Sequence, residues 1–327
     1  MNYKTLGKDL VISAVGLGCM GFSHAYGAAT EEKEAEEKIC AAYDMGYSFF
    51  DTAECYIGKA PDGSISYNEE LVGRALHDVR NHVVIATKFG VEHKGSTLLT
   101  DSRPDTIRKS VEGSLRKLDT DHIDLYFQHR IDPDVEPEEV AGVMADLIRE
   151  GKITHWGISE ANEEYLRKAH AICPVTAVQN RYSMMARWHE RIFPVLEELN
   201  VGLVAFSPMA NGFLTGKYNP SSKFEEGDFR GSMPQYTDEG MKAGQKLMEL
   251  IAALAEEKKA TDAQISLAWM LGKKPYIVPI PGSRKPERMR ENIGAAEVSL
   301  TENEIAEIDS ALDEMELPVF GGHNVVR

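Results

Sequence analysis

Three short apolar runs of the sequence end in an ionisable side chain, and a tyrosine follows one of them. FFDTAECY (49–56) passes from two phenylalanines to Asp51 and reaches Tyr56 five residues later, while VVIATK ends at Lys88 and IDLYFQH at His129. A phenol, with a pKa of about 10, is a poor acid near neutrality, and a close ammonium stabilises the phenolate and lowers that pKa. We therefore expect Lys88 to lower the pKa of Tyr56, Asp51 to keep Lys88 charged and His129 to hydrogen-bond a substrate oxygen. The set suits proton donation to a carbonyl oxygen.

Each of these residues also has a structural explanation. Asp51 could cap the following turn, Lys88 could extend its amine out of a strand end, and His129 could be a hydrogen-bonded histidine at the core boundary. Taken one at a time, the structural explanation is favoured, because charged groups near a core often serve only the fold. Their occurrence together at three apolar runs favours a shared site.

The elements that must position these residues alternate regularly between strand and helix. Residues 3–13 predict a hairpin, and residues 31–47 and 102–120 carry apolar side chains at helical spacing. Eight short β-branched or aromatic runs predict strands at 14–18, 47–51, 83–88, 123–129, 153–159, 176–180, 202–207 and 276–281. Such alternation implies parallel strands joined by crossovers, and eight units suit an α/β fold of the closed (β/α)₈, or TIM, barrel type.

In such a barrel the carboxyl ends of the strands meet at one rim, where active sites are built. The polar residues at the ends of the predicted strands are Asp51, Lys88, His129, Ser159, Gln179 with Asn180, and Ser207. Two long connections, 54–70 and 211–240, are predicted to be functional loops, adding loops and extra helices over the same face. No linker or repeat divides the sequence, which predicts one domain over residues 1–327.

Composition excludes several classes of function. The 327 residues carry 36 basic and 52 acidic side chains, a formal charge of −16, which argues against nucleic acid or an anionic membrane as a partner. The four cysteines have no metal-like or disulfide-framework spacing, so a reducing compartment is expected. The first residues lack the apolar core of a signal peptide, and no apolar run approaches the roughly 18 residues of a membrane span. A cytoplasmic protein is expected.

The chain resembles the aldo-keto reductase family over nearly its whole length. The resemblance is carried, in order, by GLGCMG, GYSFFDTAECY, NEELVGRAL, VVIATKFG, IDLYFQHR, GKITHWGIS, VQNRYS, VAFSPMANGFLTGK and IPGSRKPERMRENIGA. It implies an NADPH-dependent (β/α)₈ oxidoreductase in which Asp51, Tyr56, Lys88 and His129 match the four catalytic residues. On that basis Tyr56 supplies the proton and the nicotinamide supplies the hydride to an aldehyde or ketone.

Two segments are candidates for holding the cofactor. GLGCMG (16–21) has the form GxGxxG, but residues 22–29 separate it from the next helical pattern near Thr30, which is not the Rossmann arrangement. Residues 280–292 predict an anion site, because Ser283, a helix beginning near Pro286 and a basic cluster occur together in an acidic chain. The alternative for this segment is an ordinary basic helix surface.

The resemblance implies specific cofactor contacts. Arg284, Lys285 and Arg288 would meet the 2′-phosphate, with Glu291 and Asn292 near the adenine, while Ser159 and Gln179 would hold the carboxamide. Phe206 would stack on the nicotinamide, and Ser207, Met209 and Asn211 would follow the pyrophosphate. The remaining implied contacts are Gly18, Cys19, Met20, Asp51, Ile280, Gly282 and Ser283. Glu160 departs from the family pattern, since many relatives have an amide at this position.

The residues leave other questions open. A metal-dependent barrel hydrolase could use Asp51 and His129 as ligands, although Lys88 would oppose a cation and no paired-histidine spacing occurs, so no metal is expected. A cofactor-binding regulatory protein of the same fold with little turnover is the second alternative. The substrate is open, because loop residues that could line its pocket, Phe22, His24, Tyr26, Ile57, Met184, Met185 and Trp188, are as often structural. Oligomeric state is equally open.

Overall fold

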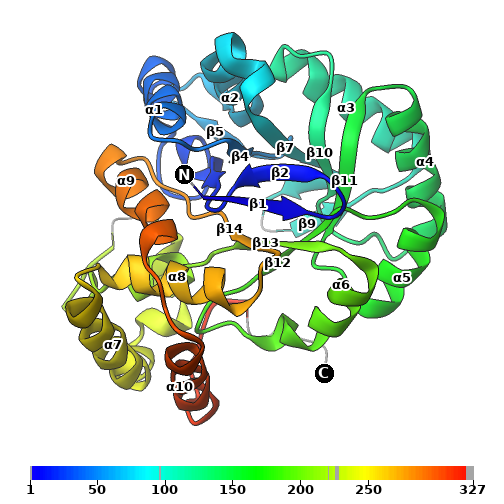
Figure 1. Ribbon diagram of the computed structural model, residues 1–327. Coiled ribbons are helices and arrows are strands. Elements are labelled where there is room, and N and C mark those ends of the chain that lie inside the picture. The colour runs from blue at the N-terminus through cyan, green and yellow to red at the C-terminus, as the bar shows by residue number, and fades with distance from the viewer. Residues whose placement is uncertain (1, 96, 220, 225–227, 322–327) are drawn as a thin grey trace.

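The chain forms a barrel of eight parallel strands surrounded by helices (Figure 1). The computed structural model describes residues 2–95, 97–219, 221–224 and 228–321. The strands, in their order around the barrel, are β3 (Leu17–Gly18), β4 (Phe49–Asp51), β7 (Val84–Phe89), β10 (Ile123–Gln128), β11 (Ile153–Ser159), β12 (Ala177–Arg181), β13 (Gly202–Phe206) and β14 (Ile277–Pro279). Each lies within one of the eight predicted runs or overlaps it, and the predicted (β/α)₈ barrel is confirmed.

The ring closes between its first and last strands. Gly18 forms a parallel bridge with Gly282, and the Gly16 amide donates a hydrogen bond of 2.9 Å to the Pro279 carbonyl. These two contacts join the edge of β3 to the segment around β14. The barrel therefore has its seam between residues at opposite ends of the sequence.

The surrounding helices are α1 (Glu32–Asp44), α2 (Asn68–Leu76), α3 (Pro104–Leu118), α4 (Pro137–Arg149), α5 (Glu163–Ile172), α6 (Phe193–Leu199), α7 (Asp238–Lys258), α8 (Asp262–Lys273), α9 (Pro286–Gly294) and α10 (Glu302–Asp313). Helix α1 buries Ala35, Ile39 and Ala42, which recur at helical spacing, and it ends before Gly46, whose φ of 105° few other residues adopt. Among the described residues, no helix is both long and apolar enough to cross a membrane.

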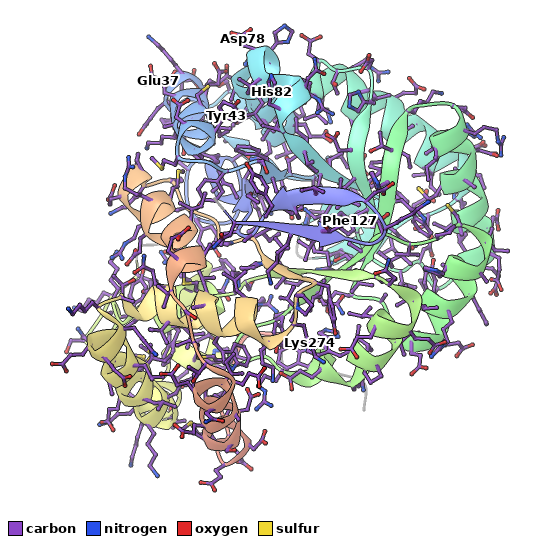
Figure 2. The ribbon with its side chains drawn as sticks, in the orientation of Figure 1. Glu37, Tyr43, Asp78, His82, Phe127 and Lys274 are labelled. Carbon is purple, nitrogen blue, oxygen red and sulfur yellow. The ribbon has the colours of Figure 1, made fainter. Side chains whose placement is uncertain are left out.

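The interior of the barrel is filled by alternate side chains of the strands, because successive residues of a strand point to opposite faces. The inward residues are Phe49, Ala86, Leu125, Phe127, Ala177, Val204 and Val278. The predicted hairpin, β1 (Tyr3–Leu6) and β2 (Leu10–Ser13), adds Leu6, Leu10 and Ile12 to this cluster. Figure 1 shows the hairpin lying across the end of the barrel, and Figure 2 shows Phe127 close to it, within the ring. The hairpin thus closes the amino-terminal end.

The loops at the other end contain more regular structure than predicted. Residues 54–70 include a hairpin, β5 (Ile57–Lys59) and β6 (Ile65–Tyr67), and a second hairpin follows β7, formed by β8 (Val91–Lys94) and β9 (Thr97–Thr100). The long segment after β13 carries three short 3-10 helices, η4 (Ala210–Thr215), η5 (Phe229–Ser232) and η6 (Pro234–Tyr236). It touches the loop after β3, because Tyr26 bridges Asp228.

Gly157 of β11 should tolerate no larger residue. A Cβ at this position would lie 2.3 Å from the ring of Phe127 and 2.4 Å from the Ala177 carbonyl oxygen. We expect Gly157→Ala to lower the free energy of unfolding by about 1–3 kcal/mol, measured by urea denaturation, because the barrel interior is already filled. Gly142→Ala in α4 is the matched control: its Cβ meets no atom within 4 Å, and a gain of about 0.5–1 kcal/mol is expected. Equal effects in the two variants would contradict this account of the interior.

Candidate active site

The rim opposite the hairpin continues the inward rows of the strands with polar side chains. Along a strand, every second side chain points to the same face, so the residue two positions after an inward residue also points inward and lies nearer the carboxyl end of the strand. By this spacing Asp51 follows Phe49, Lys88 follows Ala86, His129 follows Phe127, Ser159 follows Gly157, Gln179 follows Ala177 and Phe206 follows Val204. Asp51, Lys88, His129, Ser159 and Gln179, predicted from the strand ends, therefore converge because the period of each strand directs them inward. Asn180 and Ser207, also predicted, each follow an inward residue by one position and do not join them; the Asn180 side chain lies 3.2 Å from His189 Nδ1 instead.

Lys88 is the centre of this group. Its side chain is fully buried, and Nζ donates hydrogen bonds to Asp51 Oδ1 at 2.6 Å, to the Thr52 carbonyl at 2.7 Å and to Tyr56 Oη at 3.2 Å. An ammonium has three donors, so all of its hydrogen bonds are used. Burial is the largest single influence and opposes the charge, but the attractions and hydrogen bonds of Asp51 and Tyr56 together outweigh it and raise the pKa of Lys88. Lys88 is therefore a cation fixed against the tyrosine oxygen.

The pKa of Tyr56 differs from the expectation. Its phenol is buried, and burial raises its pKa to about 12, while the charge of Lys88 lowers it and that of Asp51 raises it. The predicted influence of Lys88 has the right sign, but the expected net lowering of the pKa is wrong. The ammonium of Lys88 stabilises the phenolate, but it is shared with the Asp51 carboxylate. The cost of removing the phenolate from water is larger than this stabilisation. Tyr56 is accordingly a protonated phenol near neutral pH.

The backbone of Tyr56 is held by a buried network that the sequence did not reveal. Asn68, the first residue of α2, donates to the Cys19 carbonyl at 2.9 Å and to Ser23 Oγ at 2.8 Å. Ser23 Oγ in turn donates to the Tyr56 carbonyl at 3.0 Å, and Thr52 Oγ1 donates to Asn68 Oδ1 at 2.7 Å. Asparagine at the start of a helix looks like an ordinary cap, so only the folded chain exposes this role.

His129 lies against the edge of Tyr56. The two rings are 5.8 Å apart between centroids at an angle of 83°. Burial and the charges of Lys88 and Arg130 hold the pKa of His129 well below its usual value, so the imidazole is neutral at pH 7. Its Nδ1 lies 3.5 Å from the sulfur of Cys55, a half-buried free thiol whose pKa burial raises to about 12. A neutral imidazole offers one donor and one acceptor.

The two residues expected to meet the carboxamide lie side by side. Ser159 Oγ donates to the Gln179 carbonyl at 2.9 Å, and Gln179 Nε2 donates to Asp51 Oδ2 at 2.7 Å. Arg130 Nη1 donates to Ser159 Oγ at 3.1 Å. Glu160, the departure from the family pattern, has a φ of 57° and accepts a hydrogen bond of 3.0 Å from the Arg181 amide. Its carboxylate therefore caps the backbone at the end of β12 by accepting this hydrogen bond.

The residues after β13 form a strained turn beside the first loop. Ser207 and Asn211 have φ values of 51° and 59°, in the left-handed region that few residues other than glycine adopt. Asn211 Nδ2 donates to Tyr26 Oη at 3.1 Å, whereas its Oδ1 is buried without a partner among the described residues. Met209 is buried, and Phe206 is partly buried beneath two guanidinium groups.

The predicted anion site comprises the loop after β14 and the first turns of α9. Its members, which follow the buried Ile280, are Gly282, Ser283, Arg284, Lys285, Arg288, Glu291 and Asn292. Arg284 donates to the Tyr26 and Ala28 carbonyls at 3.1 and 3.3 Å, and Arg288 pairs with Glu291 at 2.5 Å. Gly282 bridges Gly18, and Cys19 donates its amide to the Asp51 carbonyl at 2.8 Å. Thus Gly18 and Cys19 connect this site to the rim, and Met20 follows them in the first turn of η1 (Met20–Phe22).

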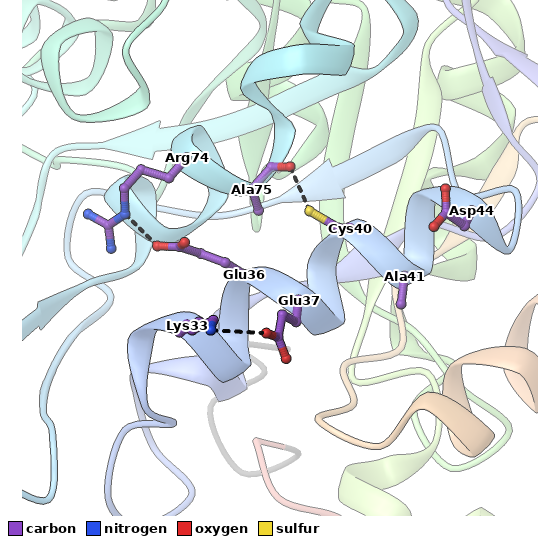
Figure 3. A pocket seen from close by; sticks show the side chains of 8 residues that line it. All are labelled: Lys33, Glu36, Glu37, Cys40, Ala41, Asp44, Arg74 and Ala75. Carbon is purple, nitrogen blue, oxygen red and sulfur yellow. Dashed lines mark hydrogen bonds and ion pairs between the residues drawn. The ribbon is translucent and has the colours of Figure 1, made fainter.

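Two further features of the described residues concern ligands other than the cofactor. No group of three or more His, Cys, Asp or Glu side chains is arranged to hold a metal ion there. A surface hollow lies between α1 and α2 (Figure 3), away from the rim, and its charged side chains pair with one another, Arg74 with Glu36 at 2.5 Å and Lys33 with Glu37 at 4.0 Å. The hollow therefore offers a ligand no unpaired basic group.

Comparison of the sequence with known protein families agrees with this geometry. A model of the aldo/keto reductase family matches residues 14–313. The chain belongs to the aldo/keto reductase family. It is therefore an oxidoreductase of that family, and the resemblance seen in its motifs is confirmed.

Relatives of this aldo/keto reductase cover almost its whole length. Probable aldo-keto reductase 1 of Glycine max is 38% identical over 92% of this chain and 86% of its own. Aldo-keto reductase yakc of Schizosaccharomyces pombe, whose name carries NADP(+), is 35% identical over 96% of this chain and 92% of its own. The structure of the glycerol dehydrogenase AKR11B4 from Gluconobacter oxydans has a TM-score of 0.85 and 29% identity, covering 96% of this chain and 95% of the other.

Proposed function

We propose that this protein reduces an aldehyde or ketone with NADPH, and that Tyr56 donates the proton. The observation that carries the proposal is the contact of one buried ammonium with both partners: Lys88 Nζ lies 2.6 Å from Asp51 Oδ1 and 3.2 Å from Tyr56 Oη. Because Lys88 already donates to Oη, the hydroxyl hydrogen of Tyr56 is free to reach another acceptor. The family of the chain and the name of its yeast relative add support.

The donor groups around β14 and α9 fit a phosphorylated cofactor. In a chain with a formal charge of −16, Arg284, Lys285 and Arg288 gather beside the N-terminus of a nine-residue helix. Lys285 is exposed, and it has no ion-pair partner among the described residues. Ser159 and Gln179 offer a hydroxyl and an amide for the carboxamide, and the ring of Phe206 offers a flat apolar face. When bound, NADPH would supply the hydride that reduces the carbonyl carbon.

The residues of the chain itself handle the proton. We infer that the neutral imidazole of His129 donates a hydrogen bond to the carbonyl oxygen, and that Tyr56 transfers its proton to the same oxygen as negative charge develops there. Lys88 then stabilises the resulting phenolate at a distance of one hydrogen bond. Asp51 keeps Lys88 charged and oriented, and Gln179 and Thr52 hold this pair in place.

The decisive test is turnover by the purified protein. We expect NADPH absorbance to fall when a panel of aldehydes and ketones is added, and full activity to remain after chelation and dialysis. Loss of activity on chelation would instead favour the metal-dependent hydrolase. Cofactor binding without turnover across a broad panel would favour the regulatory protein of the same fold.

Arg288 provides a test of cofactor preference. We expect Arg288→Ala to weaken NADPH binding by about 10- to 100-fold and NADH binding little, because a charge-assisted hydrogen bond to the 2′-phosphate is lost. Dissociation constants can be measured by quenching of tryptophan fluorescence. Arg290→Ala, which removes an exposed guanidinium from the same helix, is the matched control and should change neither. An equal loss for both cofactors would place Arg288 away from the 2′-phosphate.

Two coarser proposals complete this picture. The four cysteines are free thiols, which suits a reducing compartment, and we propose the cytoplasm. We also propose that residues 1–327 form one domain, since the larger of two buried clusters contains residues from Val15 to Val319 and the smaller one fills the barrel.

A further inference from the structure

Two arginines meet over the ring of Phe206 at the rim. Arg181 is the last residue of β12 and stands opposite Phe206 in the register of β12 and β13, with its guanidinium carbon 5.0 Å from the ring centre. Arg130 directly follows His129, and its guanidinium carbon lies 6.0 Å from the same centre. Two cationic groups therefore converge over one ring, one from the loop after β10 and one from the end of β12, two strands that β11 separates.

Neither arginine has a carboxylate partner among residues 2–95, 97–219, 221–224 and 228–321. Arg130 Nη1 donates only to the His129 carbonyl, at 2.6 Å, and to Ser159 Oγ. Arg181 Nη1 is buried and has no hydrogen-bond partner in the same part of the chain. A buried donor without a partner costs free energy, so this nitrogen indicates a missing acceptor.

The carboxylate of Glu160 influences both arginines but makes its contacts with other groups. Glu160 Oε1 accepts from the backbone amide of Arg181, and Oε2 lies 3.7 Å from His189 Nε2. This contrasts with the ordinary arginines of so acidic a chain, such as Arg187, which pairs with Glu190 and Asp313. The two rim arginines are left available for an anion from outside.

The surroundings of Tyr56 have the same electrostatic character. The His24 ring stacks on Tyr56 with centroids 6.1 Å apart, and the His93 ring lies 5.4 Å from His24. Burial lowers the pKa of His93, and its neighbours His24 and Arg130 lower it further. The charge of Arg130 therefore reaches the imidazoles of His129 and His93 and lowers the pKa of both, a setting that favours an anion over a cation.

We propose that Arg130 and Arg181 bind an anionic group on the substrate, so that the enzyme prefers aldehydes or ketones that carry a carboxylate. The inference rests on the proposed carbonyl reduction. A guanidinium presents a planar fork of donors that matches the two oxygens of a carboxylate. The anion would complete the hydrogen bonds of Arg181 while its carbonyl faces Tyr56 and His129.

The test compares 4-carboxybenzaldehyde with its neutral isostere 4-formylbenzamide. We expect the wild-type protein to have the higher kcat/KM for the acid, and Arg181→Met to reduce the acid-to-amide ratio by about 10- to 100-fold. Arg181→Lys keeps the charge without the fork and should lose less. Arg149→Met, at an exposed arginine of α4, is the control and should leave the ratio unchanged. A ratio that Arg181→Met leaves unchanged overturns the inference.

Two further measurements distinguish a substrate carboxylate from a cofactor phosphate, and failure of the anion site from failure of the proposed function. If Arg181→Met weakens NADPH binding while the ratio stays constant, the anion is a cofactor phosphate and the inference is wrong. Calorimetric titration with benzoate and benzamide needs no turnover: benzoate should bind, and Arg181→Met should abolish this binding. Benzoate binding without reduction of any carbonyl would support the anion site and overturn the proposed function. Reduction of acid and amide alike, without benzoate binding, would support the proposed function and overturn the anion site.

Discussion

Tyr56→Phe is expected to lower turnover by about 100- to 10,000-fold, the usual contribution of a positioned acid. The substitution removes one hydroxyl and leaves the ring, the Ser23 hydrogen bond to the Tyr56 carbonyl and the contact with His129. The cofactor dissociation constant should therefore change little. Steady-state rates with a carbonyl substrate, together with a fluorescence titration of NADPH, measure the two quantities separately.

The control for this variant is Tyr43→Phe. Tyr43 lies on α1, outside the barrel (Figure 2), and has no hydrogen bond through its hydroxyl among the described contacts. Its replacement should leave both turnover and cofactor binding unchanged. Retention of turnover in Tyr56→Phe would remove Tyr56 from the role of acid, whatever the behaviour of the control.

Lys88→Met should affect both stability and turnover. It leaves the Asp51 carboxylate buried without its ion-pair partner, and breaking a buried pair in this way costs about 3–5 kcal/mol. Turnover should fall as well, because the phenolate of Tyr56 loses the cation that stabilises it. Urea denaturation and initial rates give the two effects independently.

The double variant Lys88→Met with Asp51→Asn distinguishes these effects. Removing both charges leaves no unpaired ion in the core, so most of the lost free energy of unfolding should return. Turnover should stay low, since the ammonium is still absent. A double variant as unstable as Lys88→Met alone would show that the charge of Asp51 is not the source of the loss.

The strand pattern of the sequence predicts the fold and much of the rim. Alternation of short apolar runs with helical segments is a local signal, and it predicted all eight barrel strands as well as the amino-terminal hairpin. The period of two along each strand also explains why Asp51, Lys88 and Gln179, distant in sequence, are within hydrogen-bonding distance in the barrel. Their proposed roles stay predictions.

The features that could not be predicted depend on burial or on contacts between loops. Nothing local in YNEEL distinguishes Asn68 from a helix cap, because its partners Cys19 and Ser23 come from another loop. The pKa of Tyr56 was expected to fall because a nearby ammonium is visible in the sequence, whereas the extent of desolvation is not. In the sequence Arg181 likewise looks like an ordinary polar residue, and only the structure shows that its Nη1 is buried without a hydrogen-bond partner among the described residues.

The seam of the barrel has a consequence for the way the chain must be made. The bridge between Gly18 and Gly282 joins parts of the sequence that are far apart, so a nascent chain emerging from the ribosome cannot complete the ring until Gly282 has been synthesised. Until then β3 presents an unpaired edge, and contacts of such long sequence separation form slowly. Co-translational intermediates of this protein should therefore be open sheets, exposed to aggregation and suited to protection by chaperones.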